Sequence, residues 1–121
     1  MHKGRKISGG RYIKPRKKRL HELPGQKRTV KLGNLKKRSK RTRGGNLKNF
    51  MLSADSINVM SNGKSRKVKI KNVIETPSNK FLARQNVITK GTIVDTEIGK
   101  VKVTNRPSHE GVLNGVLVGQ A

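Results

Sequence analysis

The stretch KKRSKRTRGGNLK, from Lys36 to Lys48, constrains the fold of this chain more than any other. Six of the eight residues from Lys36 to Arg43 are Lys or Arg. A folded core cannot hold so many like charges side by side, because the chain has very few acidic side chains to pair with them. We therefore expect their partner to be an external and strongly anionic molecule.

The charge and the apolar residues are distributed unevenly along the 121 residues. Residues 1–50 carry a net charge of +18 and residues 51–121 a net charge of +6, which together make the +24 of the whole chain. Leu, Ile, Val and Phe number 9 in the first segment and 21 in the second. We therefore predict two parts: a basic and mostly extended N-terminal arm over residues 1–50, which would bind the anionic partner, and a small β-barrel-like domain over residues 51–121.

Several classes of site are excluded or disfavoured by composition. There is no Cys, so the chain has no disulfide and no thiolate zinc site. The histidines, His2, His21 and His109, are too far apart in sequence for a regular zinc motif, and we expect no metal and no cofactor. The sequence contains no apolar run of membrane-spanning length, so we expect no membrane partner and an intracellular, cytoplasmic protein.

The basic segment contains signals for a few short elements. Pro15 suits the start of a helix, and Arg16 to Leu23 could form two turns that end at Pro24-Gly25. Four consecutive cations make this helix unstable in isolation, so we expect it to form only when phosphates neutralise them. His21 and Glu22 are expected to form a surface pair. Thr29 to Leu32 alternates in polarity and predicts a short strand, which Gly33-Asn34 would end.

From Phe50 onward the pattern is typical of β-structure. Ile57 and Val59, then Val68 and Ile70, alternate with polar residues around Asn62-Gly63, which predicts a hairpin with one apolar and one lysine-rich face. A second hairpin is predicted from 92–96 and 100–104. The apolar run Val112 to Val118 predicts a strand buried in the middle of the sheet, and its glycines indicate bends or tight packing. The fold class is therefore mainly β, a small barrel or sandwich, with the long helix candidate in the basic arm.

Enzymatic motifs are weak. Gly63-Lys64-Ser65 lacks the preceding glycine of a phosphate-binding loop and is interpreted as a hairpin turn. Asp95 and Glu97 could share one face of a strand and hold a metal, but lysines surround them, so both should stay ionised. An RNA-processing enzyme is the least favoured hypothesis, and we predict no small-molecule substrate.

A resemblance to a known family covers almost the whole chain. The segments SGGRYIKPRKKR, HELPG and RTRGGNLK occur in this order, and they precede the block from Asn79 to Pro107 and the run GVLNGVLV. Together they closely resemble the small-subunit ribosomal protein family eight of eukaryotic and archaeal type, and the short length is similar to its archaeal branch. The resemblance implies a β-barrel-like domain on ribosomal RNA, with basic extensions that run into the RNA.

The sequence therefore predicts a structural constituent of the small ribosomal subunit that binds folded ribosomal RNA through phosphate contacts. Its partners would be small-subunit ribosomal RNA and neighbouring ribosomal proteins, without homo-oligomer formation. The alternative is a DNA-compacting or other general nucleic-acid-binding protein, which could use the same cations. Predicted RNA-binding residues are Lys3, Arg5, Lys6, Arg11, Tyr12, Lys14, Arg16, Lys17, Lys18, Arg19, Lys27, Arg28, Lys36, Lys37, Arg38, Lys40, Arg41, Arg43, Gly44, Gly45 and Lys48.

Two of these predictions concern residues other than cations. Tyr12 lies near Arg11 and Lys14, so its ring would either stack on a base or pack on the domain surface. Gly44 and Gly45 follow the cations directly, and at least one is predicted to adopt a positive φ or to lie against RNA without room for a Cβ.

Overall fold

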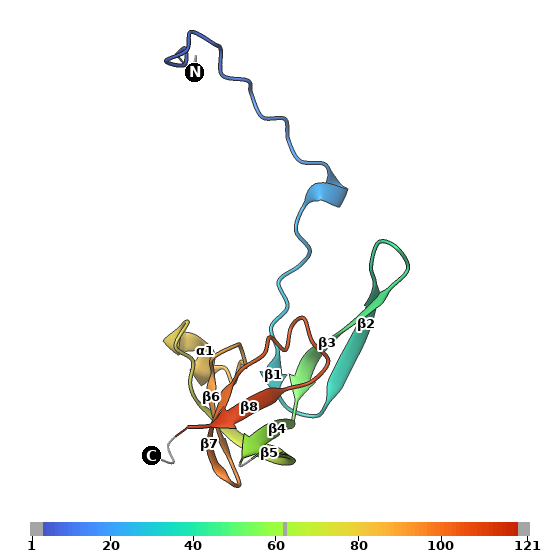
Figure 1. The fold of residues 1–121 in the computed structure, drawn as a ribbon, viewed down its shortest axis with the longest axis vertical. Helices are drawn as coiled ribbons and strands as arrows, with labels where there is room; N and C mark the ends of the chain where they lie inside the picture. The colour runs from blue at the N-terminus through green and yellow to red at the C-terminus, as the bar shows by residue number, and fades with distance from the viewer. Residues whose placement is uncertain (1–3, 62, 119–121) are drawn as a thin grey trace.

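The fold is built on a closed β-barrel, described here by a computed structural model of residues 4–61 and 63–118 (Figure 1). Five strands form the barrel in the order β4-β5-β6-β7-β8. Their bounds are Ser56–Ser61 for β4, Lys64–Glu75 for β5, Ile93–Thr96 for β6, Gly99–Val103 for β7 and Asn114–Leu117 for β8. The predicted mainly β fold is thus confirmed, in its barrel form.

Alternation of polar and apolar residues determines which side chains of β5 face the barrel core, and bulges in this strand bend it around the barrel. Val68, Ile70 and Val73 of β5 are buried, whereas the lysines between them are exposed, as predicted for this hairpin. The register of β5 against β6 shifts after Ile70 and again after Val73. Such bulges bend a strand, and they allow the 12-residue β5 to pair with β4 and then with β6. Asn62 of the predicted Asn62-Gly63 turn lies outside the described residues.

A second, three-stranded sheet in the order β1-β3-β2 lies against the barrel. It consists of β1 Lys31–Leu32, β2 Lys36–Arg41 and β3 Leu47–Ala54. Val30 and Met51 of this region are almost fully buried and belong to the same hydrophobic cluster as the barrel residues Ile57 and Val101. Val30 and Met51 pack on the barrel and β2 pairs with β3, so residues 30–50 are folded, which corrects the expectation of a mostly extended arm for this part of the chain.

Strand β3 runs without a break across position 50, where the two predicted parts meet. The segment before β1, residues 4–29, contains one three-residue 3₁₀ turn, Leu20–Glu22, and one isolated bridge between Arg5 and Arg11. In Figure 1 this segment leads away from the barrel. Its role as an RNA-binding arm stays a prediction.

The helix candidate of the basic arm, Arg16 to Leu23, contains only the 3₁₀ turn, which agrees with the expected instability of a helix with four adjacent cations in the absence of phosphates. The α-helix of the described residues is instead α1, Lys80–Arg84, which begins where the Asn79 side chain accepts a hydrogen bond of 2.9 Å from the Phe81 backbone N–H. No helix in this described part is both long and apolar enough to cross a membrane.

The prediction for Val112 to Val118 is only partly correct. β8 pairs with a strand on each side, β4 in parallel and β7 in antiparallel orientation, so it is not an edge strand. However, Val116 and Val118 are exposed, at 49% and 40% of their surface. Successive residues of a barrel strand point alternately inward and outward, so an apolar sequence does not bury the outward ones.

Candidate nucleic-acid interface

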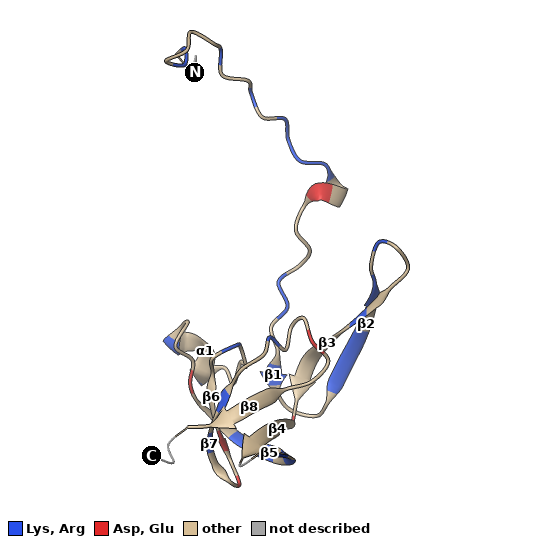
Figure 2. Cartoon of the chain, viewed as in Figure 1, with Lys and Arg blue, Asp and Glu red and all other residues tan. Residues whose placement is uncertain are grey.

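The central basic run forms one arm of a β-hairpin. Strand β2 carries five Lys and Arg side chains, and all six of its residues are exposed. It pairs in antiparallel register with β3, from Lys37 opposite Met51 to Arg41 opposite Leu47. Figure 2 shows these cations as a blue band along β2. Because the backbone is paired, β2 holds these cations at regular spacings on its two alternating faces before any partner binds.

The hairpin is anchored in the core at its base. Phe50 and Met51 of β3 are buried, and the Met51 backbone N–H donates a 3.0 Å hydrogen bond to the carbonyl of Pro107. On its other side β3 pairs in parallel with β1, with Lys31 opposite Ser53. Burial of apolar side chains at one end therefore supports a strongly cationic projection at the other.

The double glycine closes the hairpin. The Thr42 backbone N–H donates to the carbonyl of Asn46 at 2.7 Å, and the Gly45 N–H donates to the carbonyl of Thr42 at 3.2 Å. Gly44 has a φ of 91° and Gly45 a φ of 88°, which confirms the predicted positive φ. Residues with a side chain rarely adopt this backbone conformation, so the turn favours glycine at both positions.

The predicted contacts of residues 4–27 lie in a separate, exposed segment. A turn closes between Lys6 and Gly10, where the Lys6 N–H donates to the Gly10 carbonyl at 2.9 Å. The Lys6 ammonium lies 5.8 Å from the centroid of the Tyr12 ring. Tyr12 is 53% exposed and therefore does not pack on the barrel, while stacking on a base stays a prediction.

Glu22 pairs with Arg16 rather than with His21, which corrects the expected surface pair. The Arg16 guanidinium donates two hydrogen bonds to the Glu22 carboxylate, one of them 2.9 Å long, and the Arg19 backbone N–H donates a third. The Arg16 hydrogen bonds, and then the Arg19 N–H, lower the pKa of the Glu22 carboxyl. This is the one salt bridge found within residues 4–61 and 63–118.

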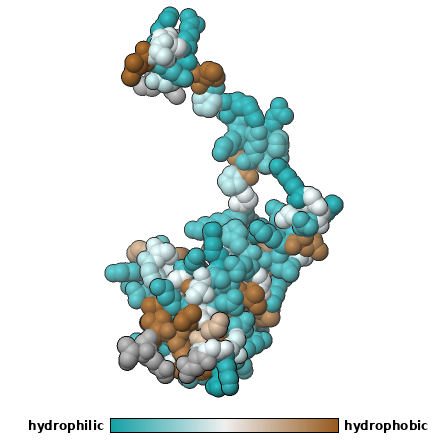
Figure 3. All heavy atoms as spheres, in the orientation of Figure 1, coloured by the Kyte–Doolittle hydropathy of each residue, from teal (hydrophilic) through white to brown (hydrophobic). Residues whose placement is uncertain are grey.

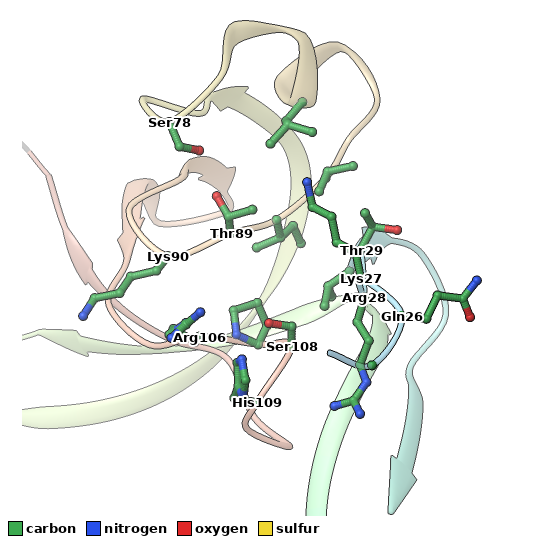
Figure 4. A pocket seen from close by; sticks show the side chains of 16 residues that line it. Gln26, Lys27, Arg28, Thr29, Ser78, Thr89, Lys90, Arg106, Ser108 and His109 are labelled. Carbon is green, nitrogen blue, oxygen red and sulfur yellow. The ribbon is translucent and has the colours of Figure 1, made fainter. Parts of the chain in front are cut away.

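Two concave surfaces flank Arg28 and His109. The first, of about 520 Å³, lies between residues 25–30, the 87–90 segment and the loop at 106–109 (Figure 4). It is lined by the cations Lys27, Arg28, Lys90 and Arg106, and by apolar side chains such as Leu82 and Val87. Ser78, Ser108 and His109 also line it, but no acidic side chain of the described residues does, so it holds no Ser-His-acid triad.

The second concave surface, which we call the hairpin pocket, has a volume of about 430 Å³. Its lining includes five cations and one aromatic ring: Arg28, Lys40, Arg41, Arg43, Lys48 and Phe50. In Figure 4 the Arg28 side chain points away from the middle of the first surface. Its guanidinium carbon lies 3.8 Å from the centroid of the Phe50 ring.

The predicted RNA-binding residues thus fall into separate groups. The hairpin pocket brings together Arg28, Lys40, Arg41, Arg43 and Lys48, and Gly44 and Gly45 lie in the adjoining turn. Lys36, Lys37 and Arg38 lie on β2 but do not line the pocket. The cations and the tyrosine before residue 28 lie outside it: Arg5, Lys6, Arg11, Tyr12, Lys14, Arg16, Lys17, Lys18, Arg19 and Lys27. Lys3 is outside the described residues.

The structure adds cations that the predicted list omits. Lys67, Lys69 and Lys71 are exposed on the outer face of β5, and Lys100 and Lys102 on that of β7. For β5 this confirms the lysine-rich face predicted from the alternation with Val68 and Ile70, and the same alternation with Val101 and Val103 marks the lysines of β7. In Figure 3 most side chains of the N-terminal segment and the hairpin are hydrophilic, with a few apolar ones among them, and apolar atoms also show on the barrel.

Acidic residues form no candidate metal site in the part that the structure describes, where no group of three His, Asp or Glu side chains converges. Asp95 lies on β6 directly opposite Lys100, and Glu97 follows in the turn.

Comparison with known proteins shows which family the chain is similar to. The model of the family described as ribosomal protein S8e matches residues 1–118. A small ribosomal subunit protein eS8 of Staphylothermus marinus is 50% identical over 118 residues, covering 94% of this chain and 91% of the relative.

Proteins of the same name from Nanoarchaeum equitans and Methanosarcina barkeri are 43% and 35% identical over 116 residues. Each comparison covers 94% of this chain and more than nine-tenths of the relative. The family consists of structural ribosomal proteins rather than enzymes. A family match over nearly the whole chain, together with these identities, shows that the chain belongs to the ribosomal protein S8e family.

Proposed function

We propose that this ribosomal protein binds folded small-subunit ribosomal RNA through contacts from its exposed cations to backbone phosphates. As a member of its family it has a structural role in the small ribosomal subunit, in the cytoplasm, beside ribosomal RNA and other ribosomal proteins. The proposal concerns how it is held there. It rests on the family membership and on the arrangement of charge.

The observation that carries the proposal is the row of unpaired cations on β2. Each of its Lys and Arg side chains is exposed, and none forms a salt bridge within the described residues. A row of five cations on a paired strand is costly to assemble in a free protein, because like charges repel. Phosphates along an RNA backbone would relieve that repulsion, and their displaced counterions would favour binding further.

Two parts of the chain would act differently in binding. The hairpin is held by its backbone pairing and by buried Phe50 and Met51, so it loses little conformational freedom on RNA. Residues 4–27 are exposed and have few backbone hydrogen bonds to the rest of the chain. They would be ordered by the RNA itself, at an entropic cost that many phosphate contacts offset.

The composition of this surface favours helical and folded RNA over unstacked bases. The chain has one Tyr, two Phe and no Trp, whereas modules that bind single strands stack bases on several aromatic rings. Phe50 is buried beneath Arg28 and is not free to stack on a base. Recognition would therefore depend on the shape of the RNA backbone.

The experiment that tests the proposal measures affinity against salt concentration. The full-length protein would be titrated with deproteinised archaeal small-subunit ribosomal RNA and with a DNA duplex as the comparison. If about ten cations contact phosphate, the slope of log K against log salt should be roughly −7 to −9, and ribosomal RNA should bind more tightly than DNA at every salt concentration. A nearly flat slope would exclude phosphate contacts as the main interaction, and equal affinity for the DNA duplex would favour general nucleic-acid binding.

A further inference from the structure

Arg28 differs from every other Lys and Arg of residues 4–61 and 63–118, because it alone is half-buried whereas the others are exposed. Its guanidinium lies over the Phe50 ring at 3.8 Å from the centroid, and Phe50 is only 8% exposed. A planar cation over the face of a buried ring makes a favourable cation–π contact. Arg28 is therefore held in one place before any ligand arrives.

The stacked guanidinium keeps its hydrogen-bond donors available. Its N–H groups lie in its own plane and point outward from its edge, so a ring on its face does not block them. Within the described residues the Arg28 side chain makes no hydrogen bond and no salt bridge. A half-buried cation with unused donors fits an acceptor from outside the chain.

The charge of the pocket defines that acceptor. Lys40, Arg41, Arg43 and Lys48 line the hairpin pocket with Arg28, and no acidic residue of the described chain lines it. Lys40 and Lys48 are directly opposed in the hairpin register, which places two like charges at one wall. A phosphate is anionic, which matches the positive potential of the pocket, and two of its oxygens can accept hydrogen bonds from the forked guanidinium of arginine.

We propose that the hairpin pocket holds a backbone phosphate of folded RNA at a bulge or sharp turn, with Arg28 as its fixed bidentate ligand and Phe50 as the residue that positions Arg28. The proposal rests on the proposed RNA-binding function. The pocket is concave and is lined from residue 28, from the hairpin and from His109. A regular RNA helix presents its phosphates on a convex surface, whereas a bulge or turn projects them into a concave site.

The decisive experiment compares two charge-preserving variants. Arg28→Lys keeps the positive charge but loses the planar fork and the stack, and Arg19→Lys makes the same change at an exposed cation outside the pocket. Both full-length variants would be titrated with in-vitro-transcribed small-subunit ribosomal RNA and with an uninterrupted RNA duplex. On ribosomal RNA, Arg28→Lys should weaken binding by about tenfold to a hundredfold, as expected for losing charged hydrogen bonds, and Arg19→Lys by about twofold or less.

The remaining outcomes separate the pocket from the general function. Neither variant should change the salt slope, because neither changes the charge. On the uninterrupted duplex the two variants should bind alike. If wild type prefers ribosomal RNA but Arg28→Lys loses no more than Arg19→Lys, the pocket proposal is wrong. If wild type does not prefer ribosomal RNA over the duplex, the proposed function itself fails.

The positioning role of Phe50 needs its own test. Phe50→Leu keeps an apolar side chain in the core but removes the ring, so it should also weaken binding to ribosomal RNA. Adding Arg28→Lys to this variant should then lower the affinity for ribosomal RNA by a further factor of about two or less, because both changes disrupt the same Arg28–Phe50 contact. Fully additive losses would contradict the stacking role.

A measurement on wild type avoids any effect of substitutions on folding. The Arg28 Nε–H resonance should differ from that of exposed Arg19 and exchange more slowly with water in the free protein. It should shift when ribosomal RNA is added. An Arg28 signal that is averaged like that of Arg19 in the free protein would contradict the fixed anchor.

Discussion

Lys40 and Lys48 lie directly opposite each other across the β2–β3 hairpin, and both are exposed. Like charges at opposed positions of an antiparallel pair destabilise it, so this hairpin contains a repulsion that its folded state alone does not relieve. Both lysines also line the hairpin pocket. In the proposed phosphate site, binding of an anion would offset this repulsion.

Replacing Lys48 with Glu should therefore have opposite effects on stability and on binding. Two opposed unlike charges should stabilise the hairpin by about 0.2–1 kcal/mol, seen as slower hydrogen exchange of the β2 and β3 amides. RNA binding should weaken, with a shallower salt slope. Lys37→Glu is the matched control, because Lys37 lies opposite Met51 and gains no partner. Faster amide exchange in the Lys48 variant would contradict the repulsion.

Replacing Gly44 and Gly45 together with Val should open the hairpin. Their φ values near +90° are strained for a β-branched residue, although a Cβ at Gly44 would meet nothing within 4 Å. We expect fast amide exchange over β2 and the tip of β3, while the barrel stays intact. RNA binding should weaken, and this loss of affinity should remain at low salt.

The sequence-based hypothesis left these glycines outside the folded part, whereas the structure makes them the hairpin turn. Val at Gly4 is the matched control, since Gly4 has no positive φ and no neighbour within 4 Å of a Cβ. If amide hydrogen exchange in the hairpin is the same in wild type and in the variant with Val at both glycines, the turn tolerates side chains.

The barrel hairpins could be predicted from sequence because their signals are local. Val68 and Ile70 alternate with lysines, and Thr96 and Gly99 flank a two-residue turn, so strand and turn both follow from neighbouring residues. The order β4-β5-β6-β7-β8 was not predictable in the same way. The parallel pairing of β8 with β4 joins residues more than 50 positions apart, such as Val59 and Gly115.

The hairpin pocket could not be predicted because it depends on tertiary structure. Lys36 to Arg41 has no apolar alternation, and a run of cations by itself indicates an unpaired segment. Pairing with β3 overrides that tendency, because Phe50 and Met51 are buried against the barrel. Arg28 was predicted as one cation among many, and only the packed Phe50 ring distinguishes it.

The Arg16–Glu22 pair predicts a local pH dependence. The pKa of Glu22 is lowered from 4.5, so the contact is fully formed above that value and is lost as the pH falls through the lower, paired value. An NMR titration of the Glu22 carboxyl should give a pKa below 4.5, and Arg16→Ala should raise it toward 4.5. Lys17→Ala, at a neighbouring cation, should have a smaller effect. Equal pKa values in wild type and Arg16→Ala would exclude this pair in solution.

The last prediction concerns Gly115, at the centre of β8. A Cβ there would lie 2.5 Å from Val101 Cγ1, 2.9 Å from Ile57 Cδ1 and 2.9 Å from the backbone oxygen of Lys102. The glycine thus marks tight packing, one of the two interpretations of the GVLNGVLVG run. Gly115→Ala should push apart strands that a closed barrel cannot easily move, and should destabilise it by about 1–3 kcal/mol.

Chemical denaturation of the full-length protein measures this effect as a lower midpoint at an unchanged slope. Gly25→Ala is the control, because a Cβ at Gly25 meets nothing within 4 Å and its midpoint should match wild type. The Val101 side chain is fully buried and branched next to its backbone, so it has little freedom to rotate away from a new methyl group. A Gly115→Ala midpoint equal to that of Gly25→Ala would mean that the barrel accommodates the methyl group, and that the close approach of β8 to β7 is not required for its stability.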